Sequence, residues 1–173
     1  MLIEVNTQEK IDELTQLKDE AFRNPHYKNA FSNEYTPGKG VQDVYKDLVF
    51  LSVNQDSDIV GCIIATHHFN ENRVSGVTML NFLGKPSAIY AKDMYEFIST
   101  YLFEKLKVHK ANWSSIVGSK YEKFSDKIAR DLGGRVVGIY KDDTKNAIGE
   151  LCDVKEYELL RSDYLKKKYG DDF

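Results

Sequence analysis

The chain has 173 residues, of which 42% are hydrophobic and 29% charged, and its formal net charge is −3. This length and composition predict one compact domain, residues 1–173, which buries roughly 70% of the surface that the unfolded chain exposes. The acidic balance excludes a broad basic face for nucleic acid, and no apolar run approaches the ~20 residues of a membrane span, so we expect a cytoplasmic protein.

The first predicted elements are a short strand and an amphipathic helix. Leu2–Val5 has a strand-like pattern, and Asn6 with Glu9 resembles a capping pair ahead of an apolar stripe that ends at Asn24–Pro25. Residues 26–47 follow, with many aromatic side chains and no periodicity. A segment of this kind inside a compact domain is typical of a binding loop or of short helices.

Three strands separated by polar turns come next, and they predict an antiparallel meander. They span Leu48–Val53, Ile59–His67 and Val74–Leu83, and the near-continuous apolar run of the second strand predicts burial on both faces. The two cysteines, Cys62 and Cys152, lie far apart in strand-like segments. This count and spacing exclude a disulfide framework, so we expect two buried and reduced thiols.

A long helix follows the meander, and the rest of the chain is organised around it. It opens near Ser87, after the turn Gly84–Pro86, and continues to about Lys107. Its apolar residues recur at three- and four-residue steps. They are Met94, Phe97, Ile98, Tyr101, Leu102 and Leu106. A strand that runs into a helix directs free N–H groups and a positive dipole end at one spot, which suits the phosphates of a cofactor.

The last third of the chain predicts two more helices and three more strands. Ser119 and Glu122 have the spacing of a capping box, and Gly133–Gly134 stops the helix that this box opens. The strands and the final short helix span Lys110–Val117, Val136–Tyr140, Leu151–Leu160 and Ser162–Lys168. The strand–helix–strand step from Met79 to Val117 predicts a parallel crossover, which makes the sheet mixed.

Four local patterns carry a resemblance to a known family. They are Tyr101–Leu106, Asp131–Gly134, Val137–Tyr140 and Asp153–Tyr164. Together with the element order, these patterns resemble the GNAT superfamily of acyl-CoA-dependent N-acyltransferases, and most closely the ribosomal-protein alanine N-acetyltransferase type. The resemblance implies an α+β fold (α/β mixed), with a central mixed, mostly antiparallel sheet of about six or seven strands flanked by helices.

The resemblance also implies acetyl-CoA as co-substrate. In the family, a Q/R-x-x-G-x-G/A loop holds the pyrophosphate on backbone N–H groups. One register of this loop puts Ser87 and Ile89 at the glycine positions, with Ala91 beyond them, and the other anchors on Gly84 and puts Pro86 at a glycine position. Either register lacks one or both glycines. The cofactor-binding residues expected are Leu80, Asn81, Phe82, Gly84, Lys85, Ser87, Ala88, Ile89, Tyr90 and Ser125.

The resemblance assigns catalytic candidates on the helix after the fifth family strand. Counting back from Gly133 puts Ser125 where a family serine contacts the CoA sulfur and protonates the leaving thiolate, and it puts Glu122 at the position of a family asparagine. Glu122 also has a purely local interpretation, the capping box. The tyrosine that acts as acid in many relatives falls at Ala129.

A third catalytic candidate is His68, which ends the second meander strand. His67 and His68 point to opposite faces of a strand, so at most one of them faces a given cleft. The alternative for such a histidine is a solvated or capping group. Their spacing from Cys62 fits no zinc pattern, so we expect no metal.

The predicted function is transfer of an acetyl group from acetyl-CoA to a primary amine of a peptide or small molecule. A carboxylate, a histidine or a water must take the amine proton, and a backbone N–H at the end of the Val74–Leu83 strand is expected to polarise the thioester carbonyl. The alternative is a catalytically degenerate GNAT-fold binding or regulatory protein that has lost its CoA loop. Neither reading includes a nucleic-acid or membrane partner, and both are compatible with a homodimer.

Overall fold

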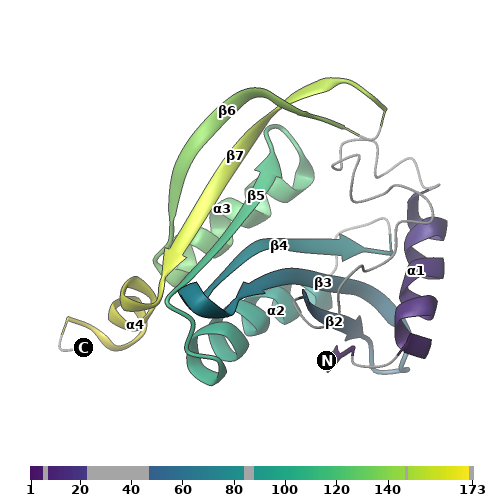
Figure 1. Ribbon diagram of the computed structural model, residues 1–173, viewed down its shortest axis with the longest axis horizontal. Coiled ribbons are helices and arrows are strands. Elements are labelled where there is room, and N and C mark those ends of the chain that lie inside the picture. Colours follow the sequence, from purple (N-terminus) through teal and green to yellow (C-terminus); the bar gives the residue numbers. More distant parts are fainter. Residues whose placement is uncertain (6–7, 23–46, 84–87, 147, 172–173) are drawn as a thin grey trace.

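The computed structural model describes residues 1–5, 8–22, 47–83, 88–146 and 148–171. Its centre is a seven-stranded sheet with the strand order β1-β2-β3-β4-β5-β7-β6 (Figure 1). The strands are β1 (Leu2–Glu4), β2 (Asp47–Val53), β3 (Ile59–His68), β4 (Arg73–Asn81), β5 (Lys110–Ile116), β6 (Arg135–Lys145) and β7 (Leu151–Leu160). All neighbouring strands are antiparallel except β4 and β5, which are parallel. The mixed, mostly antiparallel α+β fold predicted from the sequence is confirmed.

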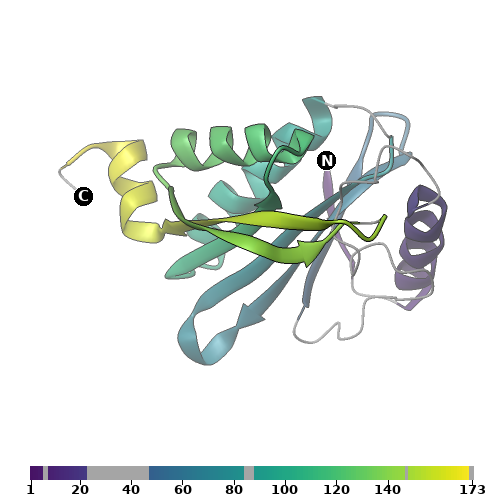
Figure 2. The same ribbon diagram turned by 90° about the horizontal axis from the view of Figure 1, so that it is seen from above.

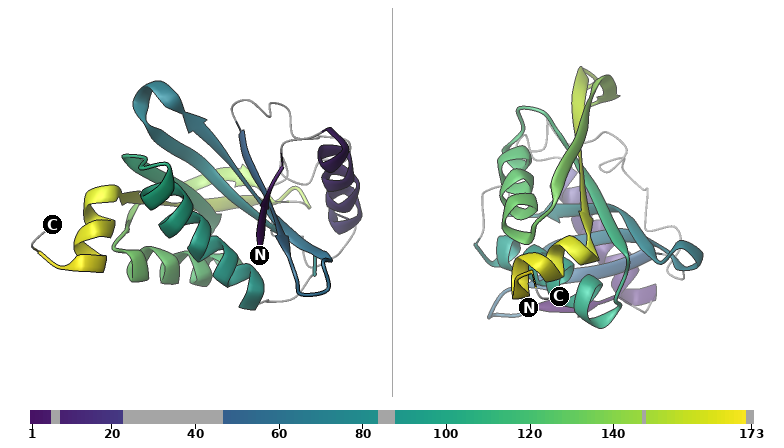
Figure 3. Two further views of the ribbon diagram at one scale, coloured as in Figure 1. Left: turned by 90° about the horizontal axis from the view of Figure 1, so that it is seen from below. Right: turned by 90° about the vertical axis from the view of Figure 1, so that its left-hand side faces the viewer.

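Helices cover both faces of this sheet, but unequally. They are α1 (Gln8–Phe22), α2 (Ala88–Glu96) with its π-helical continuation η3 (Phe97–Lys105), α3 (Lys120–Leu132) and α4 (Arg161–Tyr169), besides the short turn η2 (Phe69–Glu71). Seen from above, α2 and α3 lie on one side of the sheet and α1 lies on the other (Figure 2). The views in Figure 3 show α4 beyond the ends of these two helices.

The core is divided by the sheet into two clusters. On the side of α2 and α3, residues such as Ile63 and Phe97 are fully buried, whereas Cys62 packs with Leu14 of α1 on the other side. The two-sided burial predicted for the second meander strand is therefore confirmed. Cys62 is buried as expected, but Cys152 is only half-buried, and both thiols are free. The expectation of a second buried thiol was wrong because Cys152 lies near the tip of the outermost hairpin, β6–β7.

The long helix changes its winding halfway along. From Phe97 to Lys105 it is a π-helix, and it closes with a bond from Leu106 N–H to the carbonyl oxygen of Tyr101, 2.9 Å away. The wider turn brings residues five apart onto one face. Leu102 follows Phe97 by five residues, and Phe103 follows Ile98 by five. All four side chains are fully buried. The three- and four-residue stripe predicted for this helix did not include Phe103.

A buried hydrogen bond joins α2 to the sheet beneath it. The hydroxyl of Ser52 on β2 donates to the carboxylate of Asp93 on α2 at 2.5 Å, and Asp93 is 2% exposed. A buried carboxylate needs such partners to offset the loss of water. This contact fixes the first half of the helix relative to β2.

The last hairpin is longer than the sequence predicted. The predicted strand ended at Tyr140, but β6 continues through Asp142 to Lys145. Asp142 has φ +47° and lies in a bulge between two pairing registers of β6 and β7. Its N–H donates to Asp153 at 3.0 Å, and Lys141 forms an ion pair with the same carboxylate. Polar residues that resembled a turn are thus accommodated within the strand.

Candidate functional site

The strands β4 and β5 are neighbours at only two positions. Arg73 pairs with Lys110 and Val74 with Ala111, and beyond these pairs the strands part (Figure 1). In the described chain, no other strand pairs with the β4 edge that faces β5. The backbone N–H and C=O groups on that edge are therefore available to a ligand that lies along it.

A bulge in β4 explains why the strands part at this point. Two residues of β4, Gly76 and Val77, oppose the single residue Ala65 of β3. Gly76 has φ +60°, the left-handed conformation typical of the first residue of such a bulge. Because a bulge bends its strand, β4 turns away from β5 almost directly after the last pair.

The predicted cofactor residues on β4 are held by the sheet and by one another. Leu80 is 1% exposed and packs in the cluster beneath α1. The N–H of Phe82 donates to Val60 at 3.0 Å. The side chain of Asn81 accepts the N–H of Leu83 at 2.9 Å. These bonds fix the end of β4, and they already engage the amides of Phe82 and Leu83.

The start of α2 contains the other predicted cofactor residues. Gly84, Lys85 and Ser87 lie outside the described residues. Residues 88–90 form the first turn of α2, and Ala88 and Ile89 are exposed there. The amides of Ala88, Ile89 and Tyr90 have no acceptor within the helix, since the first N–H groups of any helix lack one. A positive dipole end and amides without acceptors inside the helix therefore lie at this end of the long helix.

The capping box predicted for α3 is confirmed. The hydroxyl of Ser119 accepts the N–H of Glu122 at 3.3 Å, and the Glu122 carboxylate accepts the N–H of Gly118 at 2.7 Å. The N–H groups of Gly118 and Glu122, on either side of the first helical residue, thus both have hydrogen-bond acceptors. The catalytic assignment of Glu122 stays a prediction.

A polar network ties α3 to β7 directly beyond this cap. Lys155 forms ion pairs with Glu122 at 3.2 Å and with Asp126 at 2.7 Å, and the Tyr157 hydroxyl donates to Asp126 at 2.8 Å. Lys155 holds the pKa of Asp126 below its usual range. Burial, reinforced by Asp126, raises the pKa of Tyr157 to about 12, so this tyrosine stays protonated and keeps donating.

Ser125 lies on the inner face of α3. It is 8% exposed and shares this face with Ile128 and Ala129, which pack on the sheet. The helix therefore points the predicted proton donor inward. Its role remains a prediction, as does that of His68.

The sheet face away from α2 and α3 carries a second polar group of residues. His68 Nε2 lies 2.6 Å from the hydroxyl of Ser75, and the side-chain amide of Asn112 donates to Glu156 at 2.9 Å. Ser75 and Asn112 are the first residues of β4 and β5 beyond their last pair. Burial raises the pKa of the Glu156 carboxyl. The sequence patterns single out His68 but give no role to Glu156.

His67 has a different environment from His68. Its ring packs against Phe69, with centroids 4.1 Å apart, and its Nε2 atom is buried without a hydrogen-bond partner in the described chain. Burial, together with the nearby His68, lowers the pKa of His67. A neutral imidazole in this position fits packing rather than proton transfer.

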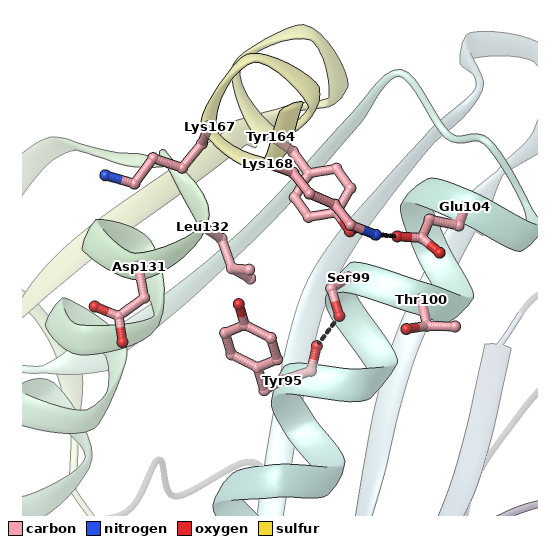
Figure 4. A pocket seen from close by; sticks show the side chains of 9 residues that line it. All are labelled: Tyr95, Ser99, Thr100, Glu104, Asp131, Leu132, Tyr164, Lys167 and Lys168. Carbon is pink, nitrogen blue, oxygen red and sulfur yellow. Dashed lines mark hydrogen bonds and ion pairs between the residues drawn. The ribbon is translucent and has the colours of Figure 1, made fainter. Parts of the chain in front are cut away.

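A separate pocket of about 330 Å³ lies where η3, α3 and α4 meet (Figure 4). Its residues are Tyr95, Ser99, Thr100, Glu104, Asp131, Leu132, Tyr164, Lys167 and Lys168. Glu104 accepts a hydrogen bond from the Tyr164 hydroxyl at 2.6 Å and pairs with Lys168. This pocket is at the C-terminal end of the long helix, whereas the predicted cofactor residues are at its start.

Neither a metal-ligand cluster nor a membrane-spanning helix is present in the described ranges. There, no three His, Cys, Asp or Glu side chains come together as a metal ion would need. The helices in these ranges are also too short or too polar to cross a bilayer.

Solved structures with the same fold are N-acetyltransferases. No family model and no curated protein sequence matches the chain. The spermidine/spermine N-acetyltransferase SpeG from Vibrio cholerae, solved with manganese ions, aligns over 96% of this chain and 95% of its own, with a TM-score of 0.69 and 13% identity. SpeG in complex with CoA and spermine aligns over 95% and 97%, with a TM-score of 0.66 and 12% identity. At this identity the likeness establishes a GNAT-like fold.

Proposed function

We propose that the chain is an N-acyltransferase that moves an acetyl group from acetyl-CoA to a primary amine. The parting of β4 and β5 beyond Val74 and Ala111 carries this proposal. It leaves a strand edge for an extended ligand and leads to a helix start that suits phosphates. The GNAT-like fold, shared with structures that include a complex with CoA and spermine, supports the same function.

Acetyl-CoA is proposed to lie along the free edge of β4 and to place its diphosphate at the start of α2. The extended arm would then run beside Leu80, Asn81 and Phe82, whose backbone positions are fixed by β3. The diphosphate would be bound by the amides of residues 88–90, together with Gly84, Lys85 and Ser87. Lys85 would offset part of the missing glycine contacts as a point charge.

The chemistry is direct transfer without a covalent enzyme intermediate. The amine arrives as an ammonium ion and gives one proton to a base, for which His68 is one candidate. Its nitrogen then attacks the thioester carbonyl, the C–N bond forms and the C–S bond breaks. We propose that Ser125 protonates the departing thiolate and regains a proton from the amide nitrogen. Glu122 is proposed to act indirectly, by holding the start of α3.

The acceptor is proposed to be a small polyamine-like amine. The neighbour solved with spermine supports a small-molecule acceptor, and the net charge of −3 favours a cationic one. The amino terminus of a peptide, as in the ribosomal-protein alanine N-acetyltransferase type, is the second candidate. A cytoplasmic location is proposed with either acceptor.

A homodimer is proposed through the edge strand β6. Its apolar side chains are half exposed on an edge that no described strand covers. They are Val136 at 45%, Val137 at 52%, Ile139 at 51% and Tyr140 at 50%. Uncovered edges of this kind pair readily with another strand. Sedimentation of the wild type and of Ile139→Lys tests the proposal. The wild type should sediment as a dimer and the variant as a monomer.

Calorimetry with acetyl-CoA tests the proposed function. We expect micromolar binding, and a thermal shift of roughly 5–10 °C at about one hundred times the dissociation constant, where linkage adds about 2.7 kcal/mol. Incubation with spermidine or with an alanine-initiated peptide should then release free thiol. Absence of binding at millimolar acetyl-CoA would favour the alternative, a degenerate GNAT-fold binding protein.

A further inference from the structure

We propose that Glu156, held by Asn112, binds the ammonium group of the acceptor and takes its proton. This inference rests on the proposed function and names the acceptor site and the base within it. Glu156 does not stand out in the sequence, and nothing in the sequence pairs it with Asn112. Their meeting depends on the pairing of β5 with β7, across 44 residues of chain.

The two side chains lie at the point where the sheet divides. Asn112 is the first residue of β5 beyond its last pair with β4, and Glu156 pairs with Ser114 in the adjacent strand β7. Trp113 follows Asn112 in β5, and Tyr157 follows Glu156 in β7. The rings of Trp113 and Tyr157 stack in the core beneath α3, with centroids 5.5 Å apart. Because strand residues alternate between faces, Asn112 and Glu156 lie on the opposite face.

This placement puts the pair across the sheet from the proposed cofactor helix. Helices α2 and α3 lie on one side of the sheet (Figure 2). Asn112 and Glu156 belong to the other face, because the alternating residues Trp113 and Tyr157 pack in the core on the side of α2 and α3. An acceptor approaching from the second face reaches the dividing strands without crossing the nucleotide. The thioester, lying along the edge of β4, would then meet the amine at the division.

The pair has unused capacity to accept hydrogen bonds. The amide nitrogen of Asn112 donates to one Glu156 oxygen at 2.9 Å, but Asn112 Oδ1 is buried without a partner among the described residues. Among the described residues, no Lys or Arg nitrogen forms an ion pair with the Glu156 carboxylate. Its neighbour Glu158, by contrast, binds both Lys110 and Arg135.

An alkylammonium group would supply the hydrogen-bond donors and the positive charge that Asn112 and Glu156 lack. It carries three N–H donors and one positive charge, and the site offers an orphaned amide oxygen and an unneutralised carboxylate. A buried acceptor without a partner is costly, so a donor supplied by a bound ligand would stabilise it. Two charged groups act on Glu156: Lys110 lowers its pKa, and Asp143 raises it. Burial is the largest influence and favours the protonated acid.

The proton balance follows from these contacts. The ammonium gives one proton to the Glu156 carboxylate, and the neutral amine attacks the thioester carbon. Ser125 gives its proton to the departing thiolate, which becomes a free thiol, and regains a proton from the nitrogen, while Glu156 releases its proton to solvent. The raised pKa makes Glu156 a better proton acceptor than an ordinary surface carboxylate. His68, bonded to Ser75 across the division, is the competing base.

The experiment compares Glu156→Gln with Asp153→Asn. Gln keeps an oxygen for the Asn112 amide but cannot take a proton, whereas Asp153 is on the same strand and pairs with Lys141 away from the division. We expect Glu156→Gln to bind acetyl-CoA like the wild type, to bind spermidine or the alanine peptide at least tenfold more weakly, and to lose about 10²–10⁴ in kcat/KM. The acid limb of the pH profile should disappear. Asp153→Asn should match the wild type.

Each failure has its own signature. If the wild type binds no acetyl-CoA, the proposed function fails, while amine binding still tests Glu156. Equal binding of both amines by the wild type and Glu156→Gln, or binding of neither amine by the wild type, would overturn the inference. So would a Glu156→Gln enzyme within threefold of wild-type turnover, and loss confined to His68→Gln would assign the base to His68.

Discussion

At the residue scale, two glutamates on β7 show how neighbours decide the behaviour of a carboxylate. Glu156 and Glu158 lie two positions apart on the same face of the strand. Burial raises the pKa of Glu156, whereas Lys110, assisted by Arg135, lowers that of Glu158. The same side chain is therefore destabilising in one position and stabilising in the other when it is ionised.

Glu156→Gln is expected to preserve or raise stability at neutral pH. The folded-state pKa of Glu156 is raised, so ionisation costs stability as pH rises above the ordinary glutamate pKa of 4.5, and this cost remains at pH 7. The variant lacks an ionisable group and escapes the cost. Thermal midpoints of both proteins should differ in favour of the variant at pH 7 and converge below about pH 4. A variant that is less stable at pH 7 would contradict this account.

Glu158→Gln should behave in the opposite way. The folded-state pKa of Glu158 is lowered, so its stabilising contribution is present above the ordinary glutamate pKa of 4.5 and is lost as pH falls through the folded-state pKa. We expect a loss of about 1 kcal/mol at pH 7, or roughly 2–4 °C in the midpoint, because the ion pairs with Lys110 and Arg135 are partly exposed. The difference should shrink in acid, and a constant difference would show that charge is not its cause.

At the element scale, local signals predicted the helices well where neighbouring residues determine the geometry. The cap of α3 could be predicted because Ser119 and Glu122 are three residues apart. The π-helix was not, since its winding follows from how Phe97 and Phe103 pack in a core built by distant strands. The Asn112–Glu156 pair was missed for the same reason. Only the register of β5 with β7 brings it together.

Gly133→Ala should loosen the junction between α3 and α4. Gly133 ends α3 with φ +88°, and a Cβ atom there would lie 3.0 Å from the carbonyl oxygen of Asp163 and 3.1 Å from the side chain of Lys167. Gly149 has nearly the same φ, +87°, with open space around it, so Gly149→Ala measures the backbone cost alone. We expect about 1–2 kcal/mol for Gly149→Ala and a larger loss of unfolding free energy in urea for Gly133→Ala. Equal losses of unfolding free energy in the two variants would mean that α4 shifts away from the added methyl group without cost.

At the scale of the whole molecule, the division of the sheet joins the two faces. Cofactor contacts are proposed on the side of α2 and α3, and acceptor contacts on the other side, so reactants meet only where β4 and β5 part. The bulge at Gly76 bends β4 at that point, directly after the Val74–Ala111 pair. One backbone conformation therefore influences both stability and the position of the reacting edge.

Gly76→Ala tests this link. The space around a Cβ atom at Gly76 is open, so the substitution acts only through the left-handed φ of +60° and should cost about 1–2 kcal/mol. Gly138→Ala is the matched control, because its Cβ atom also has open space and its φ is not in that region. Well below the midpoint, Gly76→Ala should bind acetyl-CoA several-fold more weakly than the wild type in calorimetry, since the bulge sets the course of the β4 edge. Gly138→Ala should change neither stability nor binding. If Gly76→Ala loses stability but keeps full affinity, the bulge supports the sheet without positioning the ligand edge.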